Sequence, residues 1–406
     1  MQTALSDFIR DTPEGREAND ILRNCVHCGF CTATCPTYQL LGDELDGPRG
    51  RIYLIKQALE GHTVSAKTRL HLDRCLTCRS CETTCPSGVR YHRLLDIGRA
   101  VVEERAPRRW RERLLRRLLR LVLPHSARFA ALLWLGRTVQ PMLPEALQRK
   151  IPPRQDGGAW PATVQSRTML VLDGCVQPAI APQINAASAR VLNRLGISLQ
   201  RVSGAACCGA VSYHLSAHAE GLAQMRRNID VWWPALESGA EAIVITASAC
   251  AAMVKAYGEL LQEDPNYAEK AARVSALTRD IAEVLANEDL EPLRQPAASR
   301  PQVAFHSPCT LQHAERVVGV VEQILLRLGF ALTPVADSHL CCGSAGTYSI
   351  LQRTLSAQLL SNKLTCLQAG KPDVIATANI GCLAHLATEA SVPVCHWIEL
   401  VDPQSA

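Results

Sequence analysis

The sequence predicts a protein in two parts: a mostly helical α+β domain that metal holds together, followed by two repeated α/β domains. Three observations support this fold class. Eight of the 18 cysteines lie in two tight runs near the N-terminus, another set recurs with one spacing later in the chain, and short apolar runs alternate there with helical patterns. With 406 residues, 47% of them hydrophobic, the chain is long enough for two or three packed domains.

Composition divides the chain into four segments. The first carries the clustered cysteines and shows little hydrophobic periodicity, as expected of a small domain stabilised by metal rather than by a large core. The second is a basic, Leu-rich connector that ends in a Pro- and Gly-containing linker. The last two are the repeats. We therefore expect domains at residues 1–100, 101–162, 163–298 and 299–406.

The two N-terminal cysteine runs have identical spacing, Cys-x2-Cys-x2-Cys-x3-Cys-Pro. Three thiolates at this spacing can wrap one corner of a [4Fe-4S] cluster, whereas the fourth, followed by proline, turns toward the other cluster. We therefore predict two [4Fe-4S] clusters with crossed ligation in a two-cluster ferredoxin-like domain. One cluster would take Cys25, Cys28, Cys31 and Cys85, and the other would take Cys75, Cys78, Cys81 and Cys35. Structural zinc is the alternative, but it usually uses two separated cysteine pairs.

Cysteines also mark the two later repeats. Cys175 lies 32 positions before Cys207, and Cys309 lies 32 positions before Cys341. Each later cysteine begins a Cys-Cys-Gly triplet, and one more cysteine follows about forty residues on. The sets are Cys175, Cys207, Cys208 and Cys250 in the first repeat, and Cys309, Cys341, Cys342 and Cys382 in the second.

The apolar pattern predicts strand, helix, strand order in both repeats. Glycines at 196 and 329 stand where the two predicted helices would end. The predicted strands are 169–172 and 242–246 in the first repeat and 303–305 and 373–377 in the second, with helices at 184–195 and 315–328. The cysteines would then follow strand ends, where open α/β sheets gather ligands.

Together these motifs resemble the duplicated cysteine-rich domain of heterodisulfide reductase B subunits and, over nearly the whole chain, the family of glycolate oxidase iron-sulfur subunits. That family adds a fifth cysteine to each repeat, and here Met253 and His385 stand at its place. The resemblance implies that the repeat cysteines bind a metal or a third iron-sulfur cluster, with the second repeat the better candidate. Inert, buried thiols are the alternative.

The resemblance also implies a function. The chain would be the electron-transfer subunit of a glycolate (2-hydroxy acid) dehydrogenase complex, receiving electrons from FAD on a partner subunit and passing them toward membrane quinone. Lactate or glycerol 3-phosphate oxidation, a disulfide reductase acting through the repeats, and a zinc-filled scaffold remain alternatives. No dinucleotide-binding, phosphate-binding or catalytic-triad pattern stands out, so we expect no catalytic residue in this chain.

The connector carries most of the excess positive charge. Within it, 108–120 reads RRWRERLLRRLLR, an amphipathic basic helix with leucines on one face. Segment 105–137, with Trp110 and Trp134, is predicted to contact the membrane surface or to dock on a partner or on the chain's own domains. We expect a cytoplasmic protein at the inner face of the cell membrane, with no nucleic acid partner.

Several residues near the motifs have a structural interpretation. The histidines at 27, 71 and 306 are expected to be structural, and Cys366 and Cys395 are expected to be core residues. Four arginines near the N-terminal cysteines either tune cluster potential or are ordinary solvated side chains: Arg49, Arg51, Arg74 and Arg79.

Overall fold

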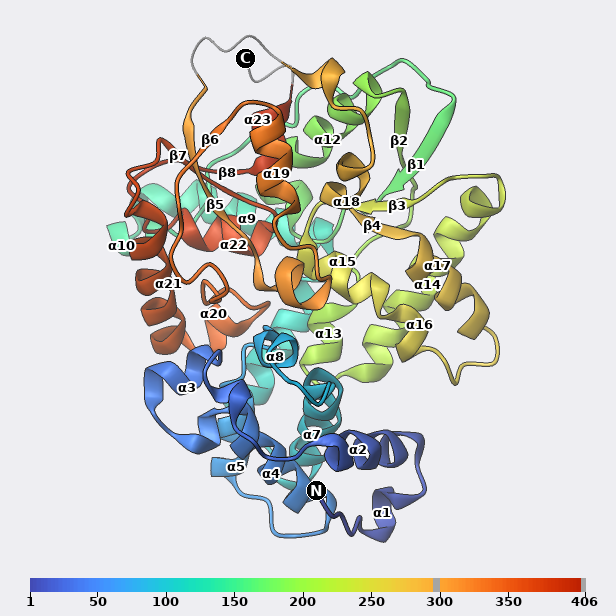
Figure 1. Cartoon of the computed structure of the whole chain (residues 1–406), viewed down its shortest axis with the longest axis vertical. Helices are drawn as coiled ribbons and strands as arrows, with labels where there is room; N and C mark the ends of the chain where they lie inside the picture. The colour runs from blue at the N-terminus through green and yellow to red at the C-terminus, as the bar shows by residue number, and fades with distance from the viewer. Residues whose placement is uncertain (295–299, 403–406) are drawn as a thin grey trace. The chain divides into compact units, whose positions relative to one another are not determined.

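The computed structural model describes residues 1–294 and 300–402. The chain divides into two compact units, and each has its own architecture. The first unit consists of Met1–Arg117 and His339–Leu360, and the second consists of Leu118–Ser338 and Ser361–Ala406. The fold class is confirmed: a helical N-terminal part precedes two parallel sheets with helices around them (Figure 1).

Helices build the first unit. They are α1 (Asp7–Arg10), α2 (Pro13–Asn24), η1 (Phe30–Thr32), α3 (Pro36–Leu41), η2 (Glu44–Asp46), α4 (Pro48–Leu59), α5 (Ala66–Asp73), α6 (Ser80–Thr83), α7 (Tyr91–Arg105) and α20 (Tyr348–Leu351). Proline at the first position of α2, α3 and α4 fits a helix start, because that residue needs no intrahelical N–H bond.

The first unit has a hydrophobic core of its own, which the sequence did not predict. Leu22, Ile55 and Leu94, from α2, α4 and α7, are fully buried in it. The helical periodicity is masked because these helices also bury a charged residue, Arg51, and a glycine, Gly98, that packs against Ile55. This core stabilises the domain in addition to the metal that the sequence predicts.

The second unit contains two four-stranded parallel sheets with the same topology. The first has the order β2-β1-β3-β4, and the second has the order β6-β5-β7-β8. Their strands are β1 (Arg167–Val171), β2 (Ile197–Arg201), β3 (Ile243–Ile245), β4 (Thr278–Asp280), β5 (Gln302–His306), β6 (Ala331–Leu332), β7 (Val374–Thr377) and β8 (Val394–His396). In each sheet the strand order reverses beside the first strand, and ligands of open α/β sheets gather at that point.

Helices cover these sheets. They are α11 (Gln177–Ile180), α12 (Gln183–Arg194), α13 (Ala210–His214), α14 (His218–Glu237), α15 (Ser248–Lys255), α16 (Tyr257–Leu260), α17 (Ala268–Leu277), α18 (Ile281–Ala286), η4 (Glu291–Leu293), η5 (Thr310–Ala314), α19 (Val320–Arg327), α21 (Arg353–Gln368), α22 (Ile380–Leu386) and α23 (Trp397–Val401). One buried cluster includes apolar residues of both sheets, among them Val171, Val244, Val303 and Ala376. The two repeats therefore share a core.

Polar contacts also join the repeats. The backbone N–H of Ser248 donates to the carbonyl of Ala378 at 3.1 Å. The imidazole of His396 lies 2.8 Å from the carbonyl of Thr246, joining β8 to the end of β3. Because these groups are buried, the contacts fix the register of one repeat on the other.

The predicted strands and the first predicted helix are confirmed. Helix α12 ends before Gly196, whose φ of +76° suits a helix C-terminus. The second prediction, one helix over 315–328, is confirmed from Val320 to its end and wrong at its start. A π-helical turn, η5, ends at Ala314, and α19 begins only at Val320, because Arg316 and Gly319 have left-handed φ values of +61° and +72°.

The connector forms α8 (Trp110–Val122), α9 (Ser126–Val139), η3 (Gln140–Met142) and α10 (Glu145–Gln148). No side chain of α8 or α9 is buried, and Trp110, Leu118 and Trp134 are among the exposed residues. Over the described ranges, no single helix is long and apolar enough to cross a membrane. Helix α8 and the segment Ser126–Met142 pass together in length and composition, but they are bent by 106°.

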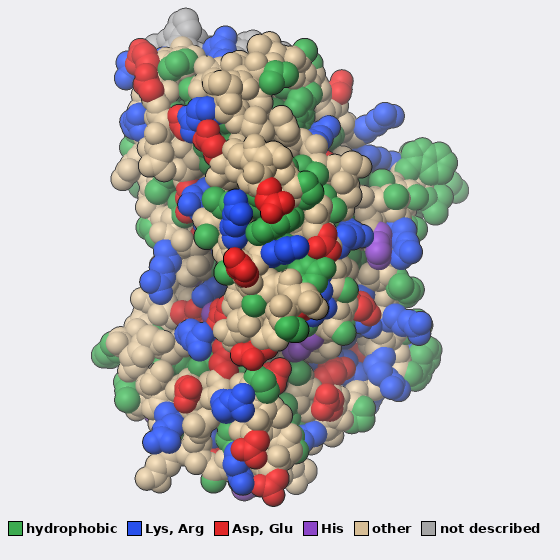
Figure 2. Space-filling model, turned by 90° about the vertical axis from the view of Figure 1, so that its right-hand side faces the viewer, with side chains coloured by type: hydrophobic (Ala, Val, Ile, Leu, Met, Phe, Trp, Pro, Cys, Tyr) green, Lys and Arg blue, Asp and Glu red, His purple; other side chains and the backbone are tan. Residues whose placement is uncertain are grey.

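Surface charge is mixed on the face that Figure 2 draws. Acidic and basic side chains are interspersed there, with hydrophobic side chains between them.

Candidate metal centres

The two N-terminal cysteine loops fold alike. In the first, His27 and Gly29 have left-handed φ values of +58° and +88°, and in the second, Thr77 and Arg79 have values of +53° and +63°. These positions match in the two motifs. Repeated left-handed residues turn backbone N–H groups toward the inside of a loop, and such a concavity favours an anionic group. The backbone N–H of Thr77 already donates to Cys75 Sγ at 3.4 Å.

Each loop lines a cavity together with the last cysteine of the other loop. The first cavity is lined by Cys25, Cys28, Cys31 and Cys85, and the second by Cys35, Cys75 and Cys78. Cys81, Pro48 and Tyr91 line both cavities, so they lie between the two. The structure thus brings all eight predicted cysteines to two adjacent cavities, in the grouping that crossed ligation requires.

The chemistry of these sulfurs fits an iron-sulfur group. Burial and the nearby Cys25 raise the pKa of the Cys31 thiol to about 11, and burial raises the pKa of Cys81 well above its ordinary value. Buried thiolates therefore need a cationic partner, which metal ligation supplies while releasing the thiol protons.

A buried arginine lies beside the second cavity. Arg51, which lines it, is 1% exposed and donates from Nε to the carbonyl of His71 at 2.7 Å. Its Nη2 donates to Thr37 Oγ1 at 3.1 Å, and that hydroxyl lies 3.3 Å from Cys35 Sγ. The same nitrogen lies 3.5 Å from the buried carboxylate of Asp46. Burial by itself lowers the pKa of Arg51, but the nearby thiolates and Asp46 together raise this pKa by more, so the guanidinium stays charged. The interpretation of Arg51 as a solvated side chain is wrong.

The first cavity has a different arginine. Arg49 lines it, but its side chain is 38% exposed and pairs with Glu44 at 2.6 Å. Solvent and this carboxylate screen its charge. Cys28 is exposed here, so this cavity is nearer to solvent than the one beside Arg51.

The first repeat brings its four predicted cysteines together at the end of its sheet. Cys175 follows β1, and Cys250 lies in α15 after the neighbouring strand β3. Hydrogen bonds from the thiols of Cys175 and Cys208 lower the pKa of Cys207 to about 3. A further hydrogen bond joins the thiols of Cys208 and Cys250. Such a cluster of hydrogen-bonded thiols suits metal binding, because a metal ion can displace the thiol protons and bind the sulfurs instead.

The glycine of each Cys-Cys-Gly triplet is required by the backbone. Gly209 and Gly343 have φ values of +92° and +90°. A Cβ at Gly209 would lie 2.9 Å from the carbonyl oxygen of Gly221, and one at Gly343 would lie 2.7 Å from that of Ser356. The triplet therefore turns sharply and presents its cysteines on a tight bend.

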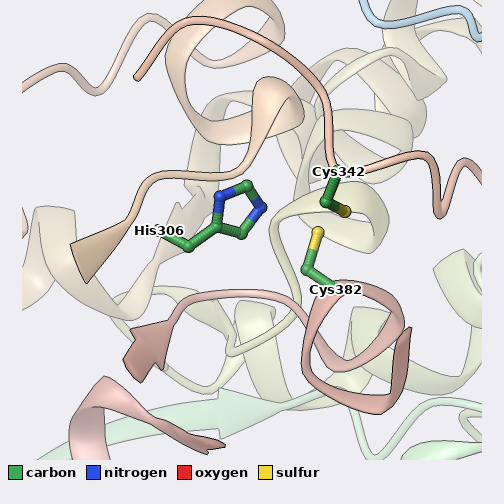
Figure 3. Close-up of side chains that lie close together, drawn as sticks. All are labelled: His306, Cys342 and Cys382. Atoms are coloured by element: carbon green, nitrogen blue, oxygen red, sulfur yellow. The ribbon is translucent and has the colours of Figure 1, made fainter. Parts of the chain in front are cut away.

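The second repeat places a histidine at its site. His306 ends β5, and Cys382 lies in α22 after the neighbouring strand β7. Their ligand atoms lie within 4.8 Å of each other. Figure 3 labels the side chains of His306 and Cys382 and shows them close to each other. The sequence predicts a structural role for His306. Its position three residues before Cys309 is nevertheless a metal-ligand spacing, which could have identified it as a candidate ligand.

The remaining residues that the sequence singled out differ in burial. Met253 is buried in the core of the first repeat, and Cys395 packs against the shared core. His71 Nδ1 lies 3.0 Å from the buried carboxylate of Asp46, so its structural interpretation is supported. His385 is partly exposed in α22.

Paired cysteine cavities on a helical domain, followed by duplicated Cys-Cys-Gly domains, define an iron-sulfur protein of the electron-transfer class. Known families match in the same places: the 4Fe-4S dicluster domain over residues 21–89 and the cysteine-rich domain over 169–255 and 303–387. The chain is 57% identical over 403 residues to the glycolate oxidase iron-sulfur subunit of Escherichia coli (strain K12), covering 99% of this chain and 98% of that one. The chain belongs to the family of glycolate oxidase iron-sulfur subunits.

More distant relatives are also similar. A probable glycolate oxidase iron-sulfur subunit of Bacillus subtilis (strain 168) is 28% identical over 95% of this chain and 92% of its own length. Lactate utilization protein A of the same organism is 25% identical over 56% of this chain and 96% of its own.

Proposed function

We propose that this chain is the electron-transfer subunit of a flavin-dependent glycolate dehydrogenase complex. The observation that carries the proposal is the crossed grouping of eight cysteines around two adjacent cavities. One [4Fe-4S] cluster takes Cys25, Cys28, Cys31 and Cys85, and the other takes Cys75, Cys78, Cys81 and Cys35. When bound, each cluster accepts and releases single electrons.

The residues of this chain hold and shield those clusters. Tyr91 and Pro48 lie between the cavities and exclude water from the space that separates them, with Tyr91 only 4% exposed. Exposed Cys28, with Val26 and Phe30 beside it, offers a surface where electrons exchange with another protein. The flavin that oxidises the substrate in a two-electron step belongs to a partner subunit, and this chain carries the electrons onward one at a time.

Glycolate is the proposed substrate of the complex because the Escherichia coli relative is named for glycolate oxidase and matches at 57% identity over nearly the whole chain. Lactate is the runner-up, since lactate utilization protein A matches only about half of this chain. The repeats are proposed to hold further metal through Cys309, Cys341, Cys342 and Cys382, and through Cys175, Cys207, Cys208 and Cys250.

Metal analysis tests the cluster proposal. The subunit is purified without oxygen, and iron, acid-labile sulfide and zinc are measured together with electron paramagnetic resonance of the reduced protein. We expect two interacting [4Fe-4S] signals. Cys85→Ser should weaken one cluster and Cys35→Ser the other, whereas Cys366→Ser, outside the cysteine motifs, should change neither. Zinc in place of iron and sulfide would refute the proposal.

Delivery to membrane quinone is proposed from the connector. Arg116 and Arg120 are ion-paired, at 3.2 Å to Asp73 and 2.6 Å to Glu220, while Leu114, Leu118 and Leu121 remain exposed. An apolar helix face that the chain itself leaves uncovered, flanked by further arginines, suits the surface of an anionic bilayer.

Flotation with anionic liposomes tests the membrane contact. Replacing Leu114, Leu118 and Leu121 by Glu should abolish flotation. Each change removes apolar area that would be buried in the bilayer and adds a negative charge that anionic lipids repel. The matched control replaces Leu70, an exposed leucine of α5, by Glu. Flotation that survives the triple change would exclude this helix as the contact.

A further inference from the structure

An imidazole without a hydrogen-bond partner is buried in the second repeat. His306 is 1% exposed, and among the residues that the structure describes neither its Nδ1 nor its Nε2 has a partner. Leaving a buried polar group without a hydrogen bond destabilises the folded state. An apolar side chain would avoid that cost, so the ring needs another reason to be there.

The place of His306 in the fold supplies that reason. It is the last residue of β5, and β5 pairs with β7 at the carboxyl edge of the sheet. Cys382 follows β7, and its Sγ lies within 4.8 Å of a ring nitrogen of His306. Asn379 donates to the same sulfur at 3.5 Å. The ring and the thiol thus meet where parallel sheets gather ligands.

We propose that His306 is a metal ligand in the second repeat, acting with Cys382. The inference rests on the proposed metal occupancy of the repeats and adds a ligand that the cysteine pattern does not contain. A neutral imidazole nitrogen donates a lone pair to zinc or iron, and mixed imidazole and thiolate sets hold both metals. The metal would satisfy one of the two ring nitrogens.

This assignment replaces the histidine that the sequence suggested. His385 stands at the place of the missing fifth cysteine, but it is only partly buried on α22. His306 is buried, and its ring lies beside Cys382 (Figure 3). Position for position, the first repeat has Leu172 where the second has His306, since each lies three residues before the first cysteine. The two repeats therefore have different donor sets.

The internal repeat also supplies the test variant. Leu172 is 2% exposed directly after β1, so a leucine is compatible with this position of the fold. His306→Leu therefore removes the nitrogen donor while keeping an apolar side chain that the same topology accepts. His306→Cys restores a soft donor, and His385→Leu is the matched control.

The experiment measures iron, sulfide and zinc in the anaerobically purified full chain, with pulsed electron paramagnetic resonance for nitrogen coupling. We expect His306→Leu to lose the metal of one centre per chain, His306→Cys to retain it without the nitrogen coupling, and His385→Leu to match the wild type. Iron and sulfide lost together identify an iron-sulfur centre, in which histidine in place of cysteine raises the potential, and zinc lost alone identifies a zinc site.

Unchanged metal content and unchanged spectra in His306→Leu would overturn the assignment, as would loss of the centre in His385→Leu alone. The signals of the two N-terminal clusters separate this result from the proposed function. Their presence with no effect at His306 would refute only the ligand assignment, whereas their absence would refute the electron-transfer proposal itself.

Discussion

The two cysteine-rich repeats share one topology and differ in the chemistry at equivalent positions. In the first, Asp280 ends β4 and caps α18, and in the second, His396 ends β8 and caps α23, both within capping boxes. Both residues are fully buried. The shared fold therefore fixes the N-cap role of this position but not whether its titratable side chain is an acid or a base.

Asp280 should make the protein less stable as pH rises. Burial raises its pKa from 3.8 to about 7, beside Glu283 and Lys255. The folded state then holds a proton that the unfolded state releases, so its stabilisation is present below pH 4 and is lost as pH rises to 7 and above. The difference is up to about 4 kcal/mol. Chemical denaturation of wild type and Asp280→Asn across this range checks it.

Asparagine keeps the cap of α18 but cannot titrate. Asp280→Asn should therefore be the more stable protein at pH 8 relative to wild type, with a smaller dependence on pH. Glu315 adds to the wild-type slope, because burial and Asp280 raise its pKa too. An identical pH profile for both proteins would contradict this account of the first repeat.

His396 should have the opposite effect. Burial lowers its pKa from 6.5 to about 4, although the Thr246 carbonyl favours the charged form. The unfolded state then binds the proton more readily, so stability is present above pH 6.5 and is lost as pH falls toward 4, by about 3 kcal/mol. His396→Asn should flatten that acid limb. If Asp280→Asn and His396→Asn showed the same dependence of unfolding free energy on pH, the contrast between the repeats would be refuted.

The Cys-Cys-Gly bend should be equally demanding in both repeats. Gly209→Ala and Gly343→Ala each combine a left-handed φ with a backbone clash, and each should lower the free energy of unfolding by about 2 kcal/mol. Gly239→Ala is the control, because its φ of +99° carries strain without a neighbour within 4 Å. Thermal unfolding measures all three, and a control as damaging as the other two would deny the clash.

The N-terminal loops extend the contrast to a smaller effect. Arg51→Gln should lower the potential of the cluster beside it, so that at a fixed applied potential its reduced-to-oxidised ratio falls about tenfold, a shift of about 59 mV. Arg49→Gln, exposed and paired with Glu44, should shift its own cluster far less. Redox titration followed by electron paramagnetic resonance compares them, and equal shifts would mean that burial of Arg51 is irrelevant.

Sequence alone determined the parts of this protein whose rules are local. Cysteine spacing predicted the two loops and the crossed grouping of their cysteines, and repeated spacing predicted two domains of one topology, because a short loop and a strand–helix–strand unit depend on neighbouring residues. It missed the break before Val320, where left-handed residues interrupt an apolar pattern of helical spacing.

Only the tertiary structure decided which distant side chains meet. It placed Arg51 beside one cavity and joined both repeats through a shared core. Within residues 1–294 and 300–402 it left the ring of His306 without a hydrogen-bond partner, beside Cys382. Burial and distance between residues far apart in the chain arise from packing, and packing is not encoded in any short window of sequence. The cysteine donors could be identified from local sequence, whereas His306 and the surroundings of each donor depended on the fold.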